Sequence, residues 1–157
     1  MITVGVGDMQ LTNRPDEVLV TYALGSCAGL AIFDPEAQVG GLLHCMLPLS
    51  QIDKAKAEAN PYMFVDTGVP ELFTEAYRLG AQKNRLKVKV AGCAQILDAQ
   101  GHFRIGERNY ATLRKILWKN NVLIDSEDVG GSISRTLYFE IASGRVSIRS
   151  NGQVKEL

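Results

Sequence analysis

The feature that most constrains this chain is a succession of short apolar runs, each ended by a turn residue. Runs of this length between Gly, Pro, Asn and Asp are typical of β-strands, and they predict strands over 2–6, 18–22, 28–33, 39–47, 86–91, 122–124, 136–141 and 146–148. Two other segments have apolar residues at helical spacing and predict helices over 69–79 and 106–120. Strands outnumber helices, and short turns join most neighbouring strands. This pattern favours a layered α/β (α+β-like) fold with a mostly antiparallel sheet.

Composition narrows the class of protein. The 157 residues suit a single domain over 1–157, and 46% hydrophobic with 22% charged residues is ordinary for a globular chain. Seventeen Lys and Arg balance seventeen Asp and Glu, so the formal net charge is zero. Binding to the nucleic-acid backbone needs a surplus of cations, and we therefore expect no nucleic acid as a partner. Residues 50–60 are polar and rich in Ala and Lys, and we expect a mobile excursion over the surface there.

The cysteines and the N-terminal residues bear on where the protein works. Three cysteines with no CxxC spacing do not form a disulfide framework or a zinc site. The first residues have no basic stretch followed by an apolar run, and no apolar stretch approaches the roughly 20 residues of a membrane span. We expect a cytoplasmic protein without membrane insertion.

One cysteine and one histidine could share a face of a hairpin. A turn over 34–37 would pair Phe33 with Gln38, and the same register pairs Cys27 with His44. Directly opposed residues have Cβ atoms about 4.5–5.5 Å apart, so a thiolate–imidazolium pair could form. A loop one residue longer would instead bring Cys45 opposite Cys27. Both alternatives stay open from the sequence alone, as does the simpler reading in which the cysteine and the histidine only pack in the core.

The bend before this cysteine is a candidate oxyanion site. Backbone N–H groups of Gly25, Ser26 and Cys27 are expected to be unpaired in such a bend and could stabilise a tetrahedral intermediate. Elsewhere the interpretation is structural: we expect the core to hold Cys45, Cys93, Trp118, Tyr62 and Phe64, and a solvated turn to hold His102. The acidic residues Asp125, Glu127 and Asp128 lack further ligands at metal spacing, and we expect no metal site.

Several motifs in order resemble those of one known family. They are Leu24-Gly25-Ser26-Cys27, the run from Gly41 to Pro48 that contains His44, Ile105-Gly106-Glu107-Arg108-Asn109, Asp128-Val129-Gly130-Gly131 followed by Arg135, and Gly144-Arg145-Val146. Together they span almost the whole chain and resemble the chemoreceptor glutamine deamidase family, CheD. The chain departs from the family pattern in two places. Ala23 stands where members often have Gly, and the stretch Gly92-Cys93-Ala94-Gln95-Ile96 stands where members usually have Gly-Gly-Ala ahead of a Met.

The resemblance implies an activity, a site and partners. It implies a cytoplasmic enzyme that needs no cofactor and hydrolyses glutamine side chains of methyl-accepting chemotaxis receptors to glutamate. It assigns the nucleophile to Cys27, the base to His44 and the third member of the triad to Thr21, with structural support from Gly106, Asn109, Asp128, Gly130, Gly131 and Arg135. It also implies a fold similar to the catalytic domains of glutamine-deamidating toxins, and the CheC phosphatase as a further partner of some members. The alternatives are a non-catalytic adaptor that binds receptors or CheC, and a cysteine protease or transglutaminase.

Overall fold

Two β-sheets form the frame of the molecule. The computed structural model describes residues 1–95 and 104–157, and over these ranges ten strands make two five-stranded sheets. The first sheet has the order β1-β3-β8-β9-β10 and the second has the order β2-β5-β4-β6-β7. Pairing is antiparallel except for β1 with β3 and β6 with β7, so both sheets are mixed. The strands are β1 (Ile2–Thr3), β2 (Asp8–Thr12), β3 (Val18–Leu24), β4 (Ala28–Asp34), β5 (Val39–Cys45), β6 (Lys87–Gly92), β7 (Ser126–Val129), β8 (Arg135–Glu140), β9 (Val146–Ser150) and β10 (Gln153–Glu156).

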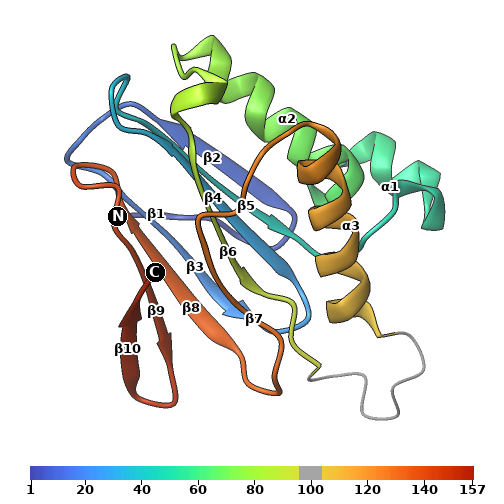
Figure 1. Ribbon diagram of the computed structural model, residues 1–157. Coiled ribbons are helices and arrows are strands. Elements are labelled where there is room, and N and C mark those ends of the chain that lie inside the picture. Colours follow the sequence, from blue (N-terminus) through green and yellow to red (C-terminus); the bar gives the residue numbers. More distant parts are fainter. Residues whose placement is uncertain (96–103) are drawn as a thin grey trace.

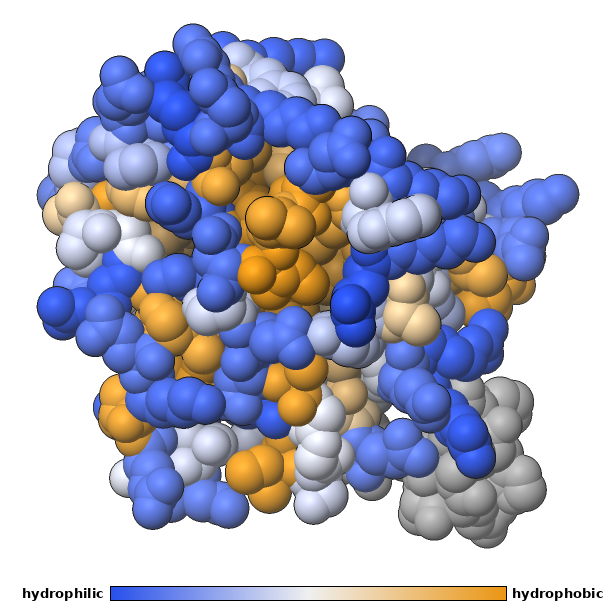
Figure 2. All heavy atoms as spheres, viewed as in Figure 1, coloured by the Kyte–Doolittle hydropathy of each residue, from blue (hydrophilic) through white to orange (hydrophobic). Residues whose placement is uncertain are grey.

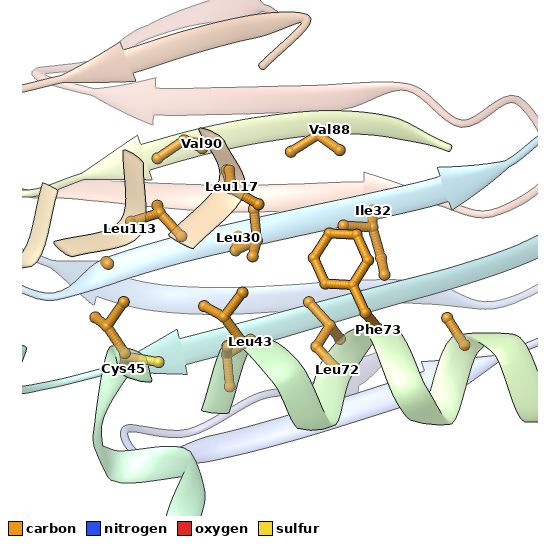
Figure 3. Close-up of a cluster of buried hydrophobic side chains, with 14 of the residues drawn as sticks. Leu30, Ile32, Leu43, Cys45, Leu72, Phe73, Val88, Val90, Leu113 and Leu117 are labelled. Atoms are coloured by element: carbon orange, nitrogen blue, oxygen red, sulfur yellow. The ribbon is translucent and has the colours of Figure 1, made fainter. Parts of the chain in front are cut away.

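The helices cover one face of the second sheet, as Figure 1 shows. They are α1 (Lys54–Ala59), α2 (Val65–Arg78) and α3 (Ile105–Lys119), with 3-10 turns at Ser50–Ile52, Pro61–Met63 and Lys83–Arg85. In Figure 3, Leu30 of β4 and Leu43 of β5 lie among Leu72 of α2 and Leu113 and Leu117 of α3. This apolar cluster joins the helical layer to the sheet, because burial of apolar side chains is the main stabilising term in folding.

A second apolar cluster lies between the two sheets. Leu19, Leu137 and Phe139 from the first sheet pack with Phe33 and Leu42 from the second. The rings of Phe33 and Phe139 meet edge-on, with centroids 6.0 Å apart. Successive strand residues point to opposite faces, so β5 sends Leu42 into this layer and Leu43 toward the helices. The fold therefore has three layers: sheet, sheet and helices.

The structure confirms most predicted elements and corrects several. The predicted helices correspond to α2 and α3, although α2 begins four residues earlier than the predicted 69–79. Residues 50–60 lie at the surface as predicted, but they also contain the short helix α1, which the sequence did not predict; Asp53 starts it by accepting a hydrogen bond from Lys56 N. The strand predicted over 122–124 is wrong, since β7 begins at Ser126, and β2 and β10 were not predicted. The expected sheet is in fact two sheets.

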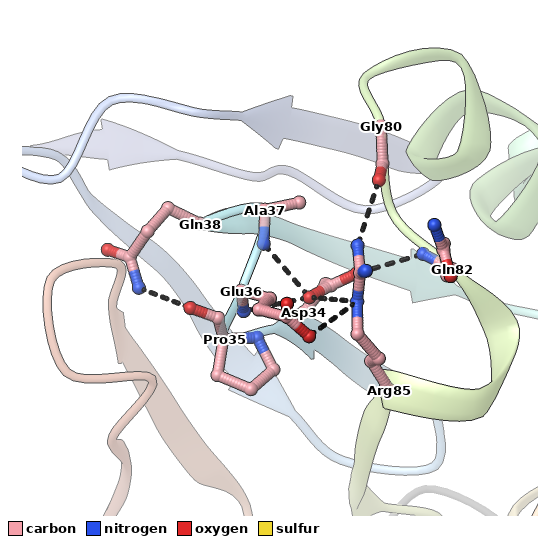
Figure 4. A network of polar contacts seen from close by, with 8 residues as sticks. All are labelled: Asp34, Pro35, Glu36, Ala37, Gln38, Gly80, Gln82 and Arg85. Carbon is pink, nitrogen blue, oxygen red and sulfur yellow. Dashed lines mark hydrogen bonds and ion pairs between the residues drawn. The ribbon is translucent and has the colours of Figure 1, made fainter.

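The register of the β4–β5 hairpin also differs from the prediction. Phe33 pairs with Gly40, and the partner of His44 is Gly29 rather than Cys27. The turn begins one residue later than predicted, because the buried carboxylate of Asp34 accepts the backbone amides of Glu36 and Ala37. Figure 4 shows these contacts with the ion pair that Asp34 makes to Arg85, at 2.8 Å. The left-handed backbone of Gln38 (φ 56°) closes the turn.

Candidate active site

A buried hydrogen bond joins the two sheets at one end of β5. The Nδ1 atom of His44, on β5, lies 2.7 Å from the hydroxyl oxygen of Thr21, on β3. Both side chains are completely enclosed. The same hydroxyl lies 2.6 Å from the carbonyl oxygen of Val4. The sequence did not indicate this carbonyl, because it is 17 residues away from Thr21 in the chain.

These two contacts assign the tautomer of the imidazole. A hydroxyl has one hydrogen, and the carbonyl of Val4 can only accept, so Thr21 donates to Val4. The oxygen of Thr21 is then the acceptor, and Nδ1 of His44 carries the proton that it receives. The other ring nitrogen, Nε2, is left with its lone pair, and it is buried with no hydrogen-bond partner among the described residues. An unprotonated Nε2 held in a fixed direction is the form that a general base requires.

Cys27 immediately precedes β4, which pairs with β5, the strand that carries His44. The carbonyl of Cys27 accepts a hydrogen bond from Cys93 N at 2.7 Å, so the backbone continues the pairing of β4 with β6 by one residue. Two residues along is Gly29, the partner of His44. Cys27 and His44 therefore stand diagonally across neighbouring strands, a placement with Cα atoms about 7–8 Å apart. Cys27 packs against the cluster between the sheets, on the face that His44 occupies.

Burial acts on both ionisable groups in this pair. It raises the pKa of the half-buried Cys27 thiol, an effect partly offset by the backbone amide of Cys27 itself. Burial lowers the pKa of His44 to about 4. Both shifts favour the neutral forms, a thiol and an imidazole, over the thiolate–imidazolium pair that the predicted hairpin register would allow.

The bend at 25–27 is held by its three carbonyl groups. Ala94 N donates to Gly25 O at 2.8 Å, Asn109 Nδ2 donates to Ser26 O at 2.9 Å, and Cys93 N donates to Cys27 O. The expectation for the amides holds only in part, because Gly25 N is occupied by the carbonyl of Ala23 at 2.9 Å. Within the described ranges, the amides of Ser26 and Cys27 donate no hydrogen bond to another residue, so these two remain candidate oxyanion donors.

The remaining motif residues form the support of this bend. A Cβ atom at Gly106 would lie 2.3 Å from Ala94 O, so only glycine lets α3 approach the 93–94 segment. Arg135 is 6% exposed and binds Gly130 O and Gly92 O, and its Nε lies 3.4 Å from the carboxylate of Asp128. Gly131 accepts a hydrogen bond from Gln95 N. These contacts connect strands of both sheets around the segment next to Cys93.

The structure places most of the other residues that the sequence analysis named. Cys45 and Cys93 are buried in the cluster under the helices, and Phe64 is enclosed, as predicted. The prediction for Trp118 is wrong, since its side chain is 78% exposed on α3. His102 lies outside the described residues. Within those residues, no group of His, Cys, Asp and Glu side chains is arranged to hold a metal ion. In the same part of the chain, no helix is both long and apolar enough to cross a membrane.

A hollow on the helical face lies apart from this site. Its volume is about 400 Å³, and Phe73 of α2, Leu117 of α3 and Val122 contribute to its lining. Figure 2 shows an apolar patch where α2 faces the chain that follows α3. None of the residues that line it belongs to the motifs around Cys27 and His44, and its lining includes no Cys or His side chain. We therefore place the candidate active site at the bend.

Comparison with known proteins identifies the family. Residues 46–150 match the family described as CheD chemotactic sensory transduction. The probable chemoreceptor glutamine deamidase CheD of Solibacter usitatus is 53% identical over 156 residues, covering 99% of this chain and 92% of the relative. The corresponding protein CheD 1 of Syntrophus aciditrophicus is 52% identical over 96% of this chain and 94% of its own length. CheD 2 of Anaeromyxobacter dehalogenans is 45% identical, with 100% of this chain and 99% of the relative covered.

One solved structure is distantly similar to this chain. A hypothetical protein of Bacillus licheniformis, YfiH, is similar with a TM-score of 0.46 and 12% identity, over 80% of this chain and 50% of that one. The family model and the curated relatives together cover every described element. This chain belongs to the CheD family.

Proposed function

We propose that this chain deamidates particular glutamine side chains of methyl-accepting chemoreceptors, producing glutamate and ammonia. Relatives that match along almost the entire chain carry the name probable chemoreceptor glutamine deamidase. The observation that carries the proposal is the buried His44, with Nδ1 bound to Thr21 and Nε2 unpartnered within the described residues, on the face shared with Cys27. A positioned base beside a thiol is the arrangement for nucleophilic catalysis on an amide.

The reaction uses groups of this chain and water. When a glutamine carboxamide enters, Nε2 of His44 takes the proton of the Cys27 thiol, and the sulfur bonds to the carbonyl carbon. The amides of Ser26 and Cys27 hold the resulting oxyanion. His44 then protonates the departing nitrogen, the C–N bond breaks and ammonia leaves a thioester. His44 next deprotonates a water molecule that attacks the thioester, and the C–S bond breaks to give glutamate and the restored thiol.

The same proposal includes the setting of the enzyme. Residues 1–157 act as one domain of the kind found in glutamine-deamidating toxins, in the cytoplasm, without a cofactor or metal. Chemoreceptors are the substrate, and the CheC phosphatase is a second partner. Thr21 acts through its hydroxyl group rather than its own carbonyl, since the hydroxyl is the atom 2.7 Å from His44.

Mass spectrometry of a receptor cytoplasmic fragment tests the activity. Incubation with the wild type is expected to add about one mass unit at specific glutamines, the change that replaces an amide nitrogen by oxygen through the acyl-enzyme. Cys27→Ala is expected to abolish the change, and Cys45→Ala, which alters a thiol on the opposite face of the sheet, is expected to retain it. A folded wild type that binds the fragment without changing its mass would identify an adaptor. Cleavage or cross-linking would identify a protease or a transglutaminase.

A further inference from the structure

One side-chain amide joins the segments that carry the two reacting groups. Asn109 lies on α3 and is fully buried. Its Nδ2 atom donates to Ser26 O at 2.9 Å and to Met46 O at 3.1 Å. Ser26 immediately precedes Cys27, and Met46 is two residues beyond His44. A single NH2 group therefore fixes the chain beside the nucleophile relative to the chain beside the base.

The planarity of the peptide bond extends this contact to Cys27. In a trans peptide unit the C=O of one residue and the N–H of the next point in opposite directions. The structure has no cis peptide bond among its described residues. Because Asn109 holds the carbonyl of Ser26 toward α3, it also directs the amide of Cys27 away from α3. That amide belongs to the same residue as the sulfur, so it is adjacent to the place where an oxyanion would form.

Within residues 1–95 and 104–157, no backbone amide binds the carbonyl of Ser26. The carbonyls of Gly25 and Cys27 are held by the backbone amides of Ala94 and Cys93, which no side-chain substitution removes. The carbonyl between them is held by a side chain. The helix that carries Asn109 packs closely on the same region, since a Cβ atom at Gly106, three residues earlier on α3, would lie 2.3 Å from Ala94 O.

We propose that Asn109 is the positioning residue of the oxyanion site, aiming the amide of Cys27 while it keeps Cys27 and His44 in register. This inference rests on the proposed function. Loss of the Asn109 side chain leaves the thiol and the imidazole in place but frees the Ser26–Cys27 peptide to rotate. The oxyanion exists only after the sulfur has attacked, so kcat should fall about 100-fold. KM should change by less than about threefold, because the ground state does not use this donor.

Two reactions of the same sulfur separate positioning from general damage. Deamidation passes through an oxyanion. Alkylation by iodoacetamide does not, since the C–S bond forms as the C–I bond breaks and iodide leaves. For Asn109→Ala we expect deamidation to fall about 100-fold while the alkylation rate of Cys27 stays within about threefold of the wild type. The matched control is Asn120→Ala, which removes an amide-to-carbonyl hydrogen bond at the other end of the same helix and is expected to leave both rates unchanged.

Each outcome has a distinct meaning. Deamidation by Asn109→Ala within about threefold of the wild type would overturn the inference, and so would an equal fall in both reactions. A wild type that shows no Cys27-dependent mass change would instead overturn the proposed function. Circular dichroism and thermal melting set an assay temperature at which the variants are folded. If Asn109→Ala is unfolded at every assay temperature, Asn109→Ser replaces it with the same expected separation of the two rates.

Discussion

At the scale of single residues, burial favours the neutral forms of Cys27 and His44. Burial raises the pKa of the thiol and lowers that of the imidazole to about 4. In the proposed mechanism the thiolate forms when a bound substrate is attacked and His44 takes the proton of the thiol. Alkylation and oxidation of the free cysteine both require the thiolate, so a raised thiol pKa slows them.

The neutral pair predicts a characteristic pH dependence of alkylation. The rate of reaction of Cys27 with iodoacetamide should rise about tenfold per pH unit from pH 6 to beyond the ordinary thiol pKa of about 8.5, because only the thiolate reacts. A preformed thiolate–imidazolium pair would give a rate that is flat between pH 5 and 8. Mass spectrometry of the alkylated cysteine measures the rate, with Cys27→Ala as the control for the other two thiols. A flat profile would contradict the neutral pair.

A second residue-scale prediction concerns Ala23, which departs from the family pattern. Its backbone is left-handed, with φ 56°, at the irregular point of the β3–β8 pairing. A non-glycine residue there is strained by roughly 1–2 kcal/mol. Ala23→Gly should therefore raise the free energy of unfolding by about 0.5–1 kcal/mol, after the greater backbone entropy of glycine in the unfolded chain is included.

Urea unfolding measures this effect, and a helical alanine provides the control. Ala55 is exposed on α1, where glycine is a poor helix former, so Ala55→Gly should lower the stability by up to about 1 kcal/mol. Opposite signs for the two substitutions are the expected result. Destabilisation by Ala23→Gly would mean that the methyl group makes a favourable contact that outweighs the strain.

At the scale of elements, the sequence predicted the two longer helices and most of the strands, but it missed α1, β2 and β10. The helices α2 and α3 follow from apolar spacing alone. The hairpin register did not, because it depends on Asp34 capping its own turn and on the left-handed Gln38, and neither is visible in the hydrophobic pattern. The short edge strands β2 and β10 were also missed. For β10 the reason is that it is exposed along its length and has no apolar alternation. Both segments are strands because they pair with a neighbouring strand, β2 with β5 and β10 with β9.

The β4–β5 turn yields the third prediction. Burial alone would raise the pKa of Asp34, but the Arg85 guanidinium and the amides of Ala37, Gln82 and Glu36 lower it to about 2. Asp34→Asn keeps the shape of the side chain and removes the charge, and it should cost roughly 2 kcal/mol of stability at pH 7. The turn carries the register that places His44 opposite Gly29, so deamidation should fall as well.

The pH dependence of this contribution has a definite sign. A carboxyl group with a depressed pKa stabilises the fold above its unfolded value of about 3.9, and the contribution disappears as the pH falls toward 2. The difference in stability between the wild type and Asp34→Asn should therefore shrink over that range in urea titrations. Glu36→Gln is the control, because Glu36 is 75% exposed and 3.5 Å from Arg85, and it should change the stability by less than about 0.5 kcal/mol. Equal losses for the two variants would contradict the assigned role of Asp34.

At the scale of the whole molecule, the candidate site is where the two sheets are tied together by polar groups. Thr21 on the first sheet binds His44 on the second, and Arg135 on the first pairs with Asp128 on the second. The sequence supplied the residue types and, through the family motifs, their roles. It did not supply their contacts, since Asn109 and Ser26 are separated by 83 residues and meet only once both sheets and α3 are in place. The sequence predicted a layered α/β fold with mostly antiparallel pairing, but it did not predict that the strands form two separate sheets.

This position of His44 couples the stability of the sandwich to pH. The pKa of the imidazole is about 4 in the folded protein and about 6.5 when unfolded, so the unfolded chain binds the extra proton between those values. The contribution of His44 to the free energy of unfolding is fully present above pH 6.5 and is lost as the pH falls toward 4, by up to about 3 kcal/mol.

Urea unfolding between pH 7.5 and 4.5 should reveal this slope in the wild type and in His102→Gln, which removes the other histidine of the chain. His44→Gln should be less stable at pH 7.5 but should lose the slope. A slope that survives in His44→Gln and vanishes in His102→Gln would assign the acid sensitivity to the other histidine and would mean that His44 is accessible to protons in the folded protein.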